Sequence, residues 1–199
     1  MVQATMNAPT KHDTIPYIAK LWNPYIDYCR AVSMRMMAIN VETAALLWYE
    51  CDQTHARSVC DLGSGFTSYV LRRYANEACY PVTVTSVDDE PEWLQKSAAY
   101  IRRHRLNPDG MTSYADWVAG TDTFDVIIHD FNSGEHRNRT MWEVAARSNP
   151  ASILIFDDMQ HEGHRNEMLK VASTYGWTTI DVHDVTTDET FRYAGMVQT

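Results

Sequence analysis

The stretch Ser58-Val-Cys-Asp-Leu-Gly-Ser-Gly-Phe-Thr-Ser68 decides the fold, because an apolar run ends in an acid and then passes through two glycines. The apolar part predicts the buried end of a strand, and residues 66–74 predict a helix. Gly63 and Gly65 permit positive φ angles and leave out side chains that would hold a ligand away from the backbone. A carboxylate or phosphate would then lie over the N-terminus of the helix, where N–H groups lack partners. The segment therefore predicts a strand that turns tightly around a small ligand.

The spacing of the glycines separates two kinds of nucleotide-binding turn. A dinucleotide-binding turn has the pattern G-x-G-x-x-G, but Ser68 stands at the third glycine position. Asp61 with Gly63 and Gly65 instead resembles the first motif of class I S-adenosylmethionine-dependent methyltransferases. The resemblance implies that Asp61, Gly63, Ser64 and Gly65 bind the methionine half of this cofactor. A glycine turn with a purely structural role is the alternative.

A second acidic motif follows the next predicted strand. Residues 81–87 are rich in β-branched side chains, and they lead into Asp88, Asp89 and Glu90 before a helical pattern at 91–104. A carboxylate at the end of the second strand can accept hydrogen bonds from both hydroxyls of a ribose. The segment also resembles the second motif of the same methyltransferases, with Asp88 as the ribose acid. Asp89 is a further candidate for cofactor binding, although an acid here also stabilises a helix N-terminus.

The remaining pattern predicts one α/β domain. Its fold class is a Rossmann-like, doubly wound and mostly parallel seven-stranded sheet, with an antiparallel last strand and helices on both faces. Residues 1–40 are expected to form an N-terminal helical segment that acts as a cap or lid, and residues 41–199 the S-adenosylmethionine-binding methyltransferase domain. Strands are expected near 57–61, 82–87, 111–114, 124–129, 151–156 and 177–182, followed by a turn and a final strand in 183–199.

The composition of the chain limits which classes of partner are expected. The formal net charge is −9, and no long run of Lys or Arg is present, so no nucleic-acid partner is expected. No apolar run is long enough to span a membrane, and the four cysteines have no metal-type or paired spacing. A reduced, cytoplasmic setting and a small-molecule substrate are therefore expected, with a homodimer as an open alternative.

Acids end two further predicted strands. Asp130 follows 124–129, while Asp157 and Asp158 follow 151–156. Because these strands are neighbours in the expected sheet, the three carboxylates should converge on one spot. Such a cluster requires a cation or a raised pKa. A divalent metal such as Mg²⁺ suits carboxylate oxygens, so the sequence predicts a metal site.

Here the chain resembles the metal-dependent O-methyltransferases, the group that contains catechol, caffeoyl-CoA and macrolide-sugar enzymes. The resemblance implies that Asp130, Asp157 and Asp158 are metal ligands and that Asp130 also borders the cofactor. The catechol-type enzymes carry a lysine just after the first acid as a base, whereas residues 131–134 contain none. The alternative is that Asp157 or Asp158 caps the next helix while Asp130 faces solvent in a turn.

Histidines are frequent around these acids. His136 and His161 are the candidate catalytic bases, because an imidazole can take a proton from a hydroxyl near neutral pH. One of them acting as a metal ligand, with a softer ion, is the alternative. Tyr114, after the third strand, is the candidate contact for adenine. The first 40 residues carry aromatic and methionine side chains, broken by Pro16 and Pro24, that either pack on the sheet or line an acceptor pocket.

Together these patterns predict a methyltransferase that moves the sulfonium methyl group of S-adenosylmethionine to a hydroxyl of a small molecule by direct displacement, helped by a divalent metal. Two alternatives remain at this stage. One is an S-adenosylmethionine-binding enzyme of another class, acting by aminopropyl transfer or cofactor cleavage. The other is a binding module without turnover.

Overall fold

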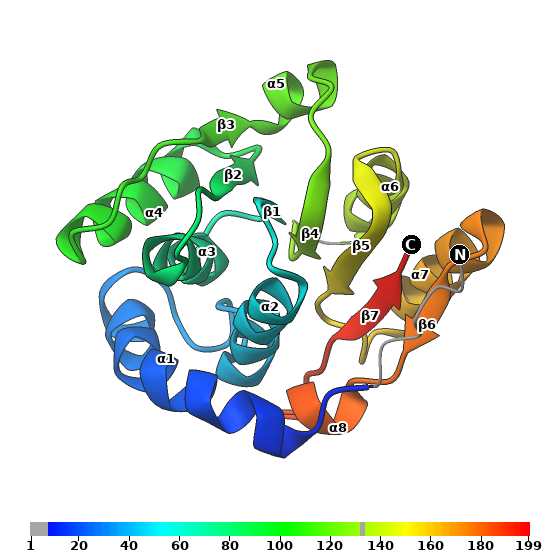
Figure 1. Cartoon of the computed structure of the whole chain (residues 1–199), viewed down its shortest axis with the longest axis horizontal. Coiled ribbons are helices and arrows are strands. Elements are labelled where there is room, and N and C mark those ends of the chain that lie inside the picture. Colours follow the sequence, from blue (N-terminus) through cyan, green and yellow to red (C-terminus); the bar gives the residue numbers. More distant parts are fainter. Residues whose placement is uncertain (1–7, 132–133) are drawn as a thin grey trace.

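The computed structural model describes residues 8–131 and 134–199, which form one sheet with helices on both sides (Figure 1). The strands of the described ranges are β1 (Ser58–Leu62), β2 (Thr83–Asp88), β3 (Met111–Ser113), β4 (Phe124–His129), β5 (Ser148–Phe156), β6 (Thr178–Ile180) and β7 (Gly195–Gln198). The helices are α1 (Lys11–Ala31), α2 (Val41–Thr54), α3 (Phe66–Glu77), α4 (Pro91–Arg103), α5 (Tyr114–Ala119), α6 (Gly134–Ala145), α7 (Glu162–Tyr175) and α8 (His183–Thr186).

The strand order is β3-β2-β1-β4-β5-β7-β6. All neighbours among β1 to β5 are parallel, whereas β7 lies antiparallel between β5 and β6 (Figure 1). The predicted fold class is therefore confirmed, including the antiparallel pairing of the last strand with the sixth. Leu62 is in register with Val87 and with His129, and His129 is in register with Phe156. Consequently the acids that follow β2, β4 and β5 all leave the sheet at one edge.

Alternation along the strands divides the core between the two faces of the sheet. Val59, Val126 and Ile128 belong to a buried cluster shared with α1, α2, α3 and α4. Cys60 and Ile127, one position away, belong to a second cluster shared with α5, α6 and α7. Successive side chains of a strand point to opposite faces, so the central strands β1 and β4 are buried from both sides.

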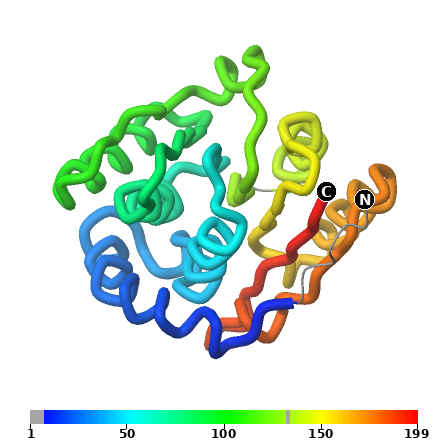
Figure 2. The backbone as a smooth tube through the Cα atoms, in the orientation of Figure 1, coloured from blue at the N-terminus to red at the C-terminus, as the bar shows by residue number. Residues whose placement is uncertain are grey.

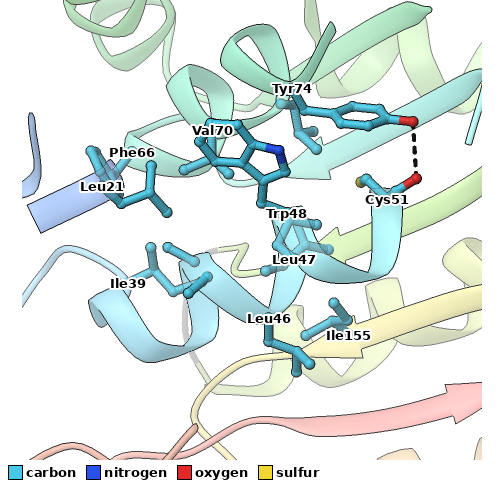
Figure 3. Close-up of a cluster of buried hydrophobic side chains, with 14 of the residues drawn as sticks. Leu21, Ile39, Leu46, Leu47, Trp48, Cys51, Phe66, Val70, Tyr74 and Ile155 are labelled. Carbon is cyan, nitrogen blue, oxygen red and sulfur yellow. Dashed lines mark hydrogen bonds between the residues drawn. The ribbon is translucent and has the colours of Figure 1, made fainter. Parts of the chain in front are cut away.

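The first of these clusters holds α2 and α3 against the sheet (Figure 3). Trp48 of α2 lies beside Val70 of α3, and Ile155 of β5 closes the cluster from the sheet side (Figure 3). The hydroxyl of Tyr74 donates to the carbonyl of Cys51 at 2.9 Å, which satisfies a carbonyl near the C-terminal end of α2. Apolar burial and this hydrogen bond together fix the position of α3, which begins at the glycine turn.

The N-terminal helix α1 runs without interruption through Pro16 and Pro24, so the expected break at the prolines is wrong. Pro16 is exposed and Pro24 half-buried, while Leu21, Tyr25 and Tyr28 of the same helix are buried in the core. Burial of these three side chains offsets the two missing backbone donors. Figure 2 shows α1 along the outside of α2 and α3. Among the described residues, no helix is both long and apolar enough to cross a membrane.

Two other boundaries differ from the sequence prediction. β5 begins at Ser148, before the expected start at 151, and Ala151 has a left-handed φ of 68°. The register with β4 shifts between Phe124 and Val126, and alternation of apolar residues does not reveal such an irregularity. The short helix α8 replaces part of the turn that was expected after the sixth strand.

One buried acid in this core lacks a partner. Glu50 of α2 is fully buried, and neither carboxyl oxygen has a hydrogen-bond partner. Burial raises the pKa of Glu50 to about 7. The folded chain therefore keeps this carboxyl protonated at pH values where the unfolded chain ionises it.

We expect Glu50→Gln to stabilise the fold relative to the wild type as pH rises from 4.5 to 7. Below this window the carboxyl is protonated in both states, and within it only the unfolded chain gains by ionising. The difference in free energy of unfolding should grow by about 3 kcal/mol across the window. Denaturant unfolding at pH 4.5 and pH 8 measures it. A difference that does not change with pH would contradict the unpaired burial of Glu50.

Candidate functional site

Asp61 holds the glycine turn from behind. It is completely buried, and its Oδ2 accepts hydrogen bonds from the hydroxyls of Ser68 at 2.6 Å and Thr67 at 3.0 Å. Its Oδ1 accepts from the hydroxyl of Ser86, which also accepts from Arg72 at 2.7 Å. The carboxylate thus joins β1, the first turn of α3 and β2. Its place under the turn indicates a role in shaping the turn, while the predicted contact of Asp61 with the cofactor stays a prediction.

Gly63 and Gly65 are required for different reasons. Gly63 has a φ of 96°, and a Cβ built on it would lie 2.1 Å from the carbonyl oxygen of Asp130. Gly65 has an extended φ of 172°, so the expectation of a positive φ there is wrong. A Cβ on Gly65 would instead lie 3.1 Å from the hydroxyl of Tyr28. The absence of a side chain at Gly63 allows the turn after β1 to approach the backbone of Asp130 after β4. The absence of one at Gly65 leaves space beside Tyr28.

Asp88 is joined to the glycine turn. Its Oδ2 accepts from the backbone N–H and the hydroxyl of Ser64, both at 2.8 Å, and its Oδ1 accepts from the N–H of Glu90 at 3.0 Å. Each carboxylate oxygen has two acceptor positions, so Oδ1 keeps one for a ribose hydroxyl. Asp89 lies next in the chain, with its Oδ2 4.0 Å from Nε2 of His136. The turn and the end of β2 therefore form one rigid unit.

Three aromatic rings, those of Tyr114, Phe131 and His136, form a group next to Asp89. The ring of Tyr114 stacks on Phe131 at 5.0 Å between centroids, and His136 meets Tyr114 edge-on at 5.5 Å. The hydroxyl of Tyr114 donates to Glu143. His136 thus lies beside Tyr114, the residue predicted to contact adenine, and that contact stays a prediction.

The three acids at the ends of β4 and β5 converge. Ligand oxygens of Asp130, Asp157 and Asp158 all lie within 4.8 Å of one another, which confirms the predicted convergence. Asp157 is buried and its Oδ1 has no hydrogen-bond partner. Burial and the two neighbouring carboxylates raise its pKa well above the ordinary value. Asp158 adopts a left-handed φ of 63° at the strand end.

A cation from the chain itself lies among these acids. Nη2 of Arg137 donates to Oδ1 of Asp130 at 2.6 Å, and Nη1 donates to Oδ2 of Asp158 at 2.5 Å. Its Nε donates to the carbonyl of Phe131 at 3.2 Å, and the residue is only 3% exposed. Burial opposes the ionisation of Asp158, but the guanidinium holds the pKa of Asp158 below its ordinary value.

The sequence analysis did not identify Arg137. A cationic residue was sought only in the four positions after Asp130. Arg137, Thr140, Met141 and Val144 are all buried, and their spacing is that of one helix face. This spacing was the available signal, because it places Arg137 on the side of α6 that faces the sheet.

The arrangement of these residues does not fit a divalent metal as it stands. Carboxylate oxygens are suitable ligands, but Arg137 already uses one oxygen of Asp130 and one of Asp158. A divalent ion between them would face the guanidinium.

The second predicted base, His161, lies at the N-cap of α7 with its ring 5.5 Å from that of His164.

A crevice of about 310 Å³ connects the glycine turn with two of the acids. Neither His136 nor His161 is among the described residues that line it. The turn and Asp130 were expected there, whereas Arg137 and Trp93 were not. Tyr28, Met36 and Met37 line it too, which agrees with one of the two interpretations of the first 40 residues, that their aromatic and methionine side chains line a pocket. The lining consists of Tyr28, Ser33, Met36, Met37, Ala38, Ile39, Gly63, Ser64, Gly65, Phe66, Thr67, Trp93, Asp130, Arg137 and Asp158.

Several solved structures share this architecture. An O-methyltransferase from Bacillus cereus in complex with SAH is 13% identical, with 99% of this chain and 92% of that chain covered at a TM-score of 0.65. TomG from Streptomyces achromogenes, an O-methyltransferase involved in tomaymycin synthesis, in complex with SAM, is 12% identical, with 98% and 92% covered at 0.64. Cofactor-bound Rv0187 from MTB is 13% identical, with 96% and 97% covered at 0.66.

No protein-family model matches the sequence, and no curated protein matches it significantly. At identities this low, the structural similarity shows the fold. The chain therefore has the Rossmann-like fold of class I S-adenosylmethionine-dependent methyltransferases.

We expect Gly63→Ala to destabilise the protein by about 2 kcal/mol or more, because a methyl group would meet the Asp130 carbonyl at a positive φ. Binding of S-adenosylhomocysteine should weaken together with stability. Gly163→Ala is the matched control, since a Cβ at Gly163 in α7 meets nothing within 4 Å. Thermal unfolding of both variants checks the expectation. Equal stability of the two would show that β1 and β4 can separate at no cost.

Proposed function

We propose that this chain is an S-adenosylmethionine-dependent methyltransferase that transfers a methyl group to an oxygen of a small molecule. The observation that carries the proposal is the crevice, in which the glycine turn and the paired Asp130, Arg137 and Asp158 face one space. A ligand held at the turn would have its reactive end beside these charged groups. In open α/β sheets, ligands commonly bind at the carboxyl ends of the strands, which supports this position.

The cofactor would be held by complementary charge and by the backbone. We infer that its carboxylate lies over the N-terminus of α3, where N–H groups lack helical partners. Its ammonium and sulfonium groups are both positive, and Asp130 offers a carboxylate on the same wall of the crevice. The ribose hydroxyls would reach the remaining acceptor position of Asp88. In this arrangement Ser64 links the two halves of the cofactor site, because it bonds Asp88 and lines the crevice.

The reaction would be a direct displacement. An oxygen of the acceptor attacks the methyl carbon, the carbon–sulfur bond breaks, and its electron pair remains on sulfur to give S-adenosylhomocysteine. The acceptor proton must leave during this step. Asp158 and Asp130 line the crevice and are better placed to receive it than His136 and His161, which remain predictions as bases. The main contribution of the protein is then alignment of the two reactants.

The acceptor side of the crevice is largely apolar. Met36 and Met37 lie on the segment between α1 and α2, and Trp93 lies in the first turn of α4. Met36 is 60% exposed and Met37 is 67% exposed, so both have room to adjust to a bound molecule. A small organic acceptor with an apolar body and a hydroxyl would suit this lining. The predicted role of residues 1–40 as a cap or lid is part of the same proposal.

Binding provides the first test. The wild-type chain should bind S-adenosylhomocysteine in calorimetry, and Asp88→Ala should weaken binding by about 1.5–3 kcal/mol, the range for hydrogen bonds to a charged group. Asp122→Ala is the control, because this exposed acid precedes β4 at the opposite edge of the sheet. If Asp88→Ala binds as tightly as the wild type, Asp88 does not contact the cofactor.

Product analysis tests the reaction class. With labelled S-adenosylmethionine and small-molecule extracts, mass spectrometry should detect S-adenosylhomocysteine together with a methylated hydroxyl compound. Methylthioadenosine as the product would instead indicate aminopropyl transfer or cofactor cleavage. Binding of the cofactor with neither product, across many extracts, would favour a binding module.

A further inference from the structure

We propose that Arg137 takes the place of a divalent cation in the carboxylate cluster, defined as Asp130, Asp157 and Asp158, so that this crevice works without a metal. The statement that catalysis needs no metal rests on the proposed function. Its structural content, that the cluster excludes metal ions, stands by itself. Arg137 is inferred to be a positioning residue that fixes the strand ends against each other.

The geometry of the guanidinium is that of a fork between two carboxylates. Nη1 and Nη2 bond to Asp158 and Asp130 at 2.5 and 2.6 Å, and Nε bonds to the carbonyl of Phe131 at 3.2 Å. The group therefore has donors directed at both strand ends and at the residue after β4. Charge-assisted bonds of this kind are short and directional. They join the residues that follow β4 and β5 to each other and to α6, which is a link that a bridging metal could also provide between the two acids.

Arg137 is anchored where it lies. Its own carbonyl accepts a hydrogen bond from the hydroxyl of Thr140 at 2.9 Å, and the same hydroxyl lies 2.6 Å from Nε2 of His129. His129 is the last residue of β4 and is fully buried. The helix that carries Arg137 is thus joined to β4, the strand that Asp130 follows. Displacing the guanidinium would leave two carboxylates without its hydrogen bonds.

The charge of the cluster is mostly compensated without an added ion. Arg137 offsets one of the three formal negative charges of the cluster. A bound cofactor would offset one more, because its sulfonium and ammonium groups are positive and its carboxylate is negative. A divalent cation would add positive charge beside both the guanidinium and the sulfonium, where it would be repelled. The cluster therefore suits a cationic cofactor better than a metal.

Metal binding by the wild-type chain tests the proposal directly. Electron paramagnetic resonance with Mn²⁺ alone should show no stoichiometric binding at low millimolar concentration. Affinity for S-adenosylhomocysteine should be equal in excess chelator and in excess Mg²⁺. Stoichiometric Mn²⁺ binding that Asp158→Asn abolishes would overturn the proposal. A wild-type chain that binds neither Mn²⁺ nor S-adenosylhomocysteine would instead refute the proposed function and leave this inference standing.

Arg137→Met provides the converse experiment, because it removes the charge and keeps a long apolar side chain. The three carboxylates should then bind Mn²⁺ roughly 10–100-fold more tightly than in the wild type, the range by which neighbouring groups tune metal sites. Asp158→Asn in the same background should remove that gain. Arg139→Met is the control, since Arg139 lies on the exposed side of the same helix and should leave Mn²⁺ binding unchanged.

If Arg137→Met does not fold, as judged by circular dichroism, Arg137→Lys serves in its place. A lysine keeps the charge but cannot bond both acids in one plane, so a gain in Mn²⁺ affinity smaller than tenfold is expected. A folded Arg137→Met chain with no gain in Mn²⁺ affinity would show that the guanidinium is not what keeps metal out, and the proposal would fail.

Discussion

The hydroxyl bonds to the buried carboxylate of Asp61 are the interaction on which the rest of the site depends. Ser68 and Thr67 reach it from the start of α3, and Ser86 reaches it from β2. One carboxylate thereby fixes the relative position of a strand, a turn, a helix and the next strand. Every partner is a neutral hydroxyl, and Arg72 adds a cation through Ser86. Both carboxylate oxygens of Asp61 have hydroxyl donors, which favours a single shape of the turn.

The parallel register carries this order across the sheet. Because β1, β2, β4 and β5 end in line, the charges that follow them are forced together at one edge. Like charges so close require compensation, and this chain provides a guanidinium from α6 between Asp130 and Asp158. The compensation has a geometric consequence, since Arg137 also joins α6 to the residues that follow β4 and β5. The contacts of Arg137 with Asp130 and Asp158 therefore compensate negative charge and also fix the position of α6.

The apolar wall of the crevice depends on a distant part of the chain. Arg192 donates to the carbonyls of Ala38 at 3.0 Å and Arg35 at 3.3 Å, and Asp188 holds Arg192 in place at 3.0 Å. The segment between α1 and α2 is thus joined to the loop before β7, so the C-terminal strand, which has no group in the crevice, still helps to position Met36 and Met37. The exposed side chains keep freedom of movement on a fixed backbone.

Most of the elements, and the end of the sheet at which chemistry is expected, could be predicted from the sequence. Apolar strands ending in acids, the pair Gly63 and Gly65, and helical spacing between them are local signals, so the α/β order and the convergence of Asp130 with Asp157 and Asp158 followed from them. The tertiary structure alone decided which partner each acid takes. Arg137 reaches Asp158 across 21 positions, and Gly63 is close to Asp130 only because two strands are in register. Helical spacing indicates which side of α6 faces the sheet, but it does not indicate which carboxylates Arg137 reaches, because contacts between distant residues depend on how the helices pack on the sheet.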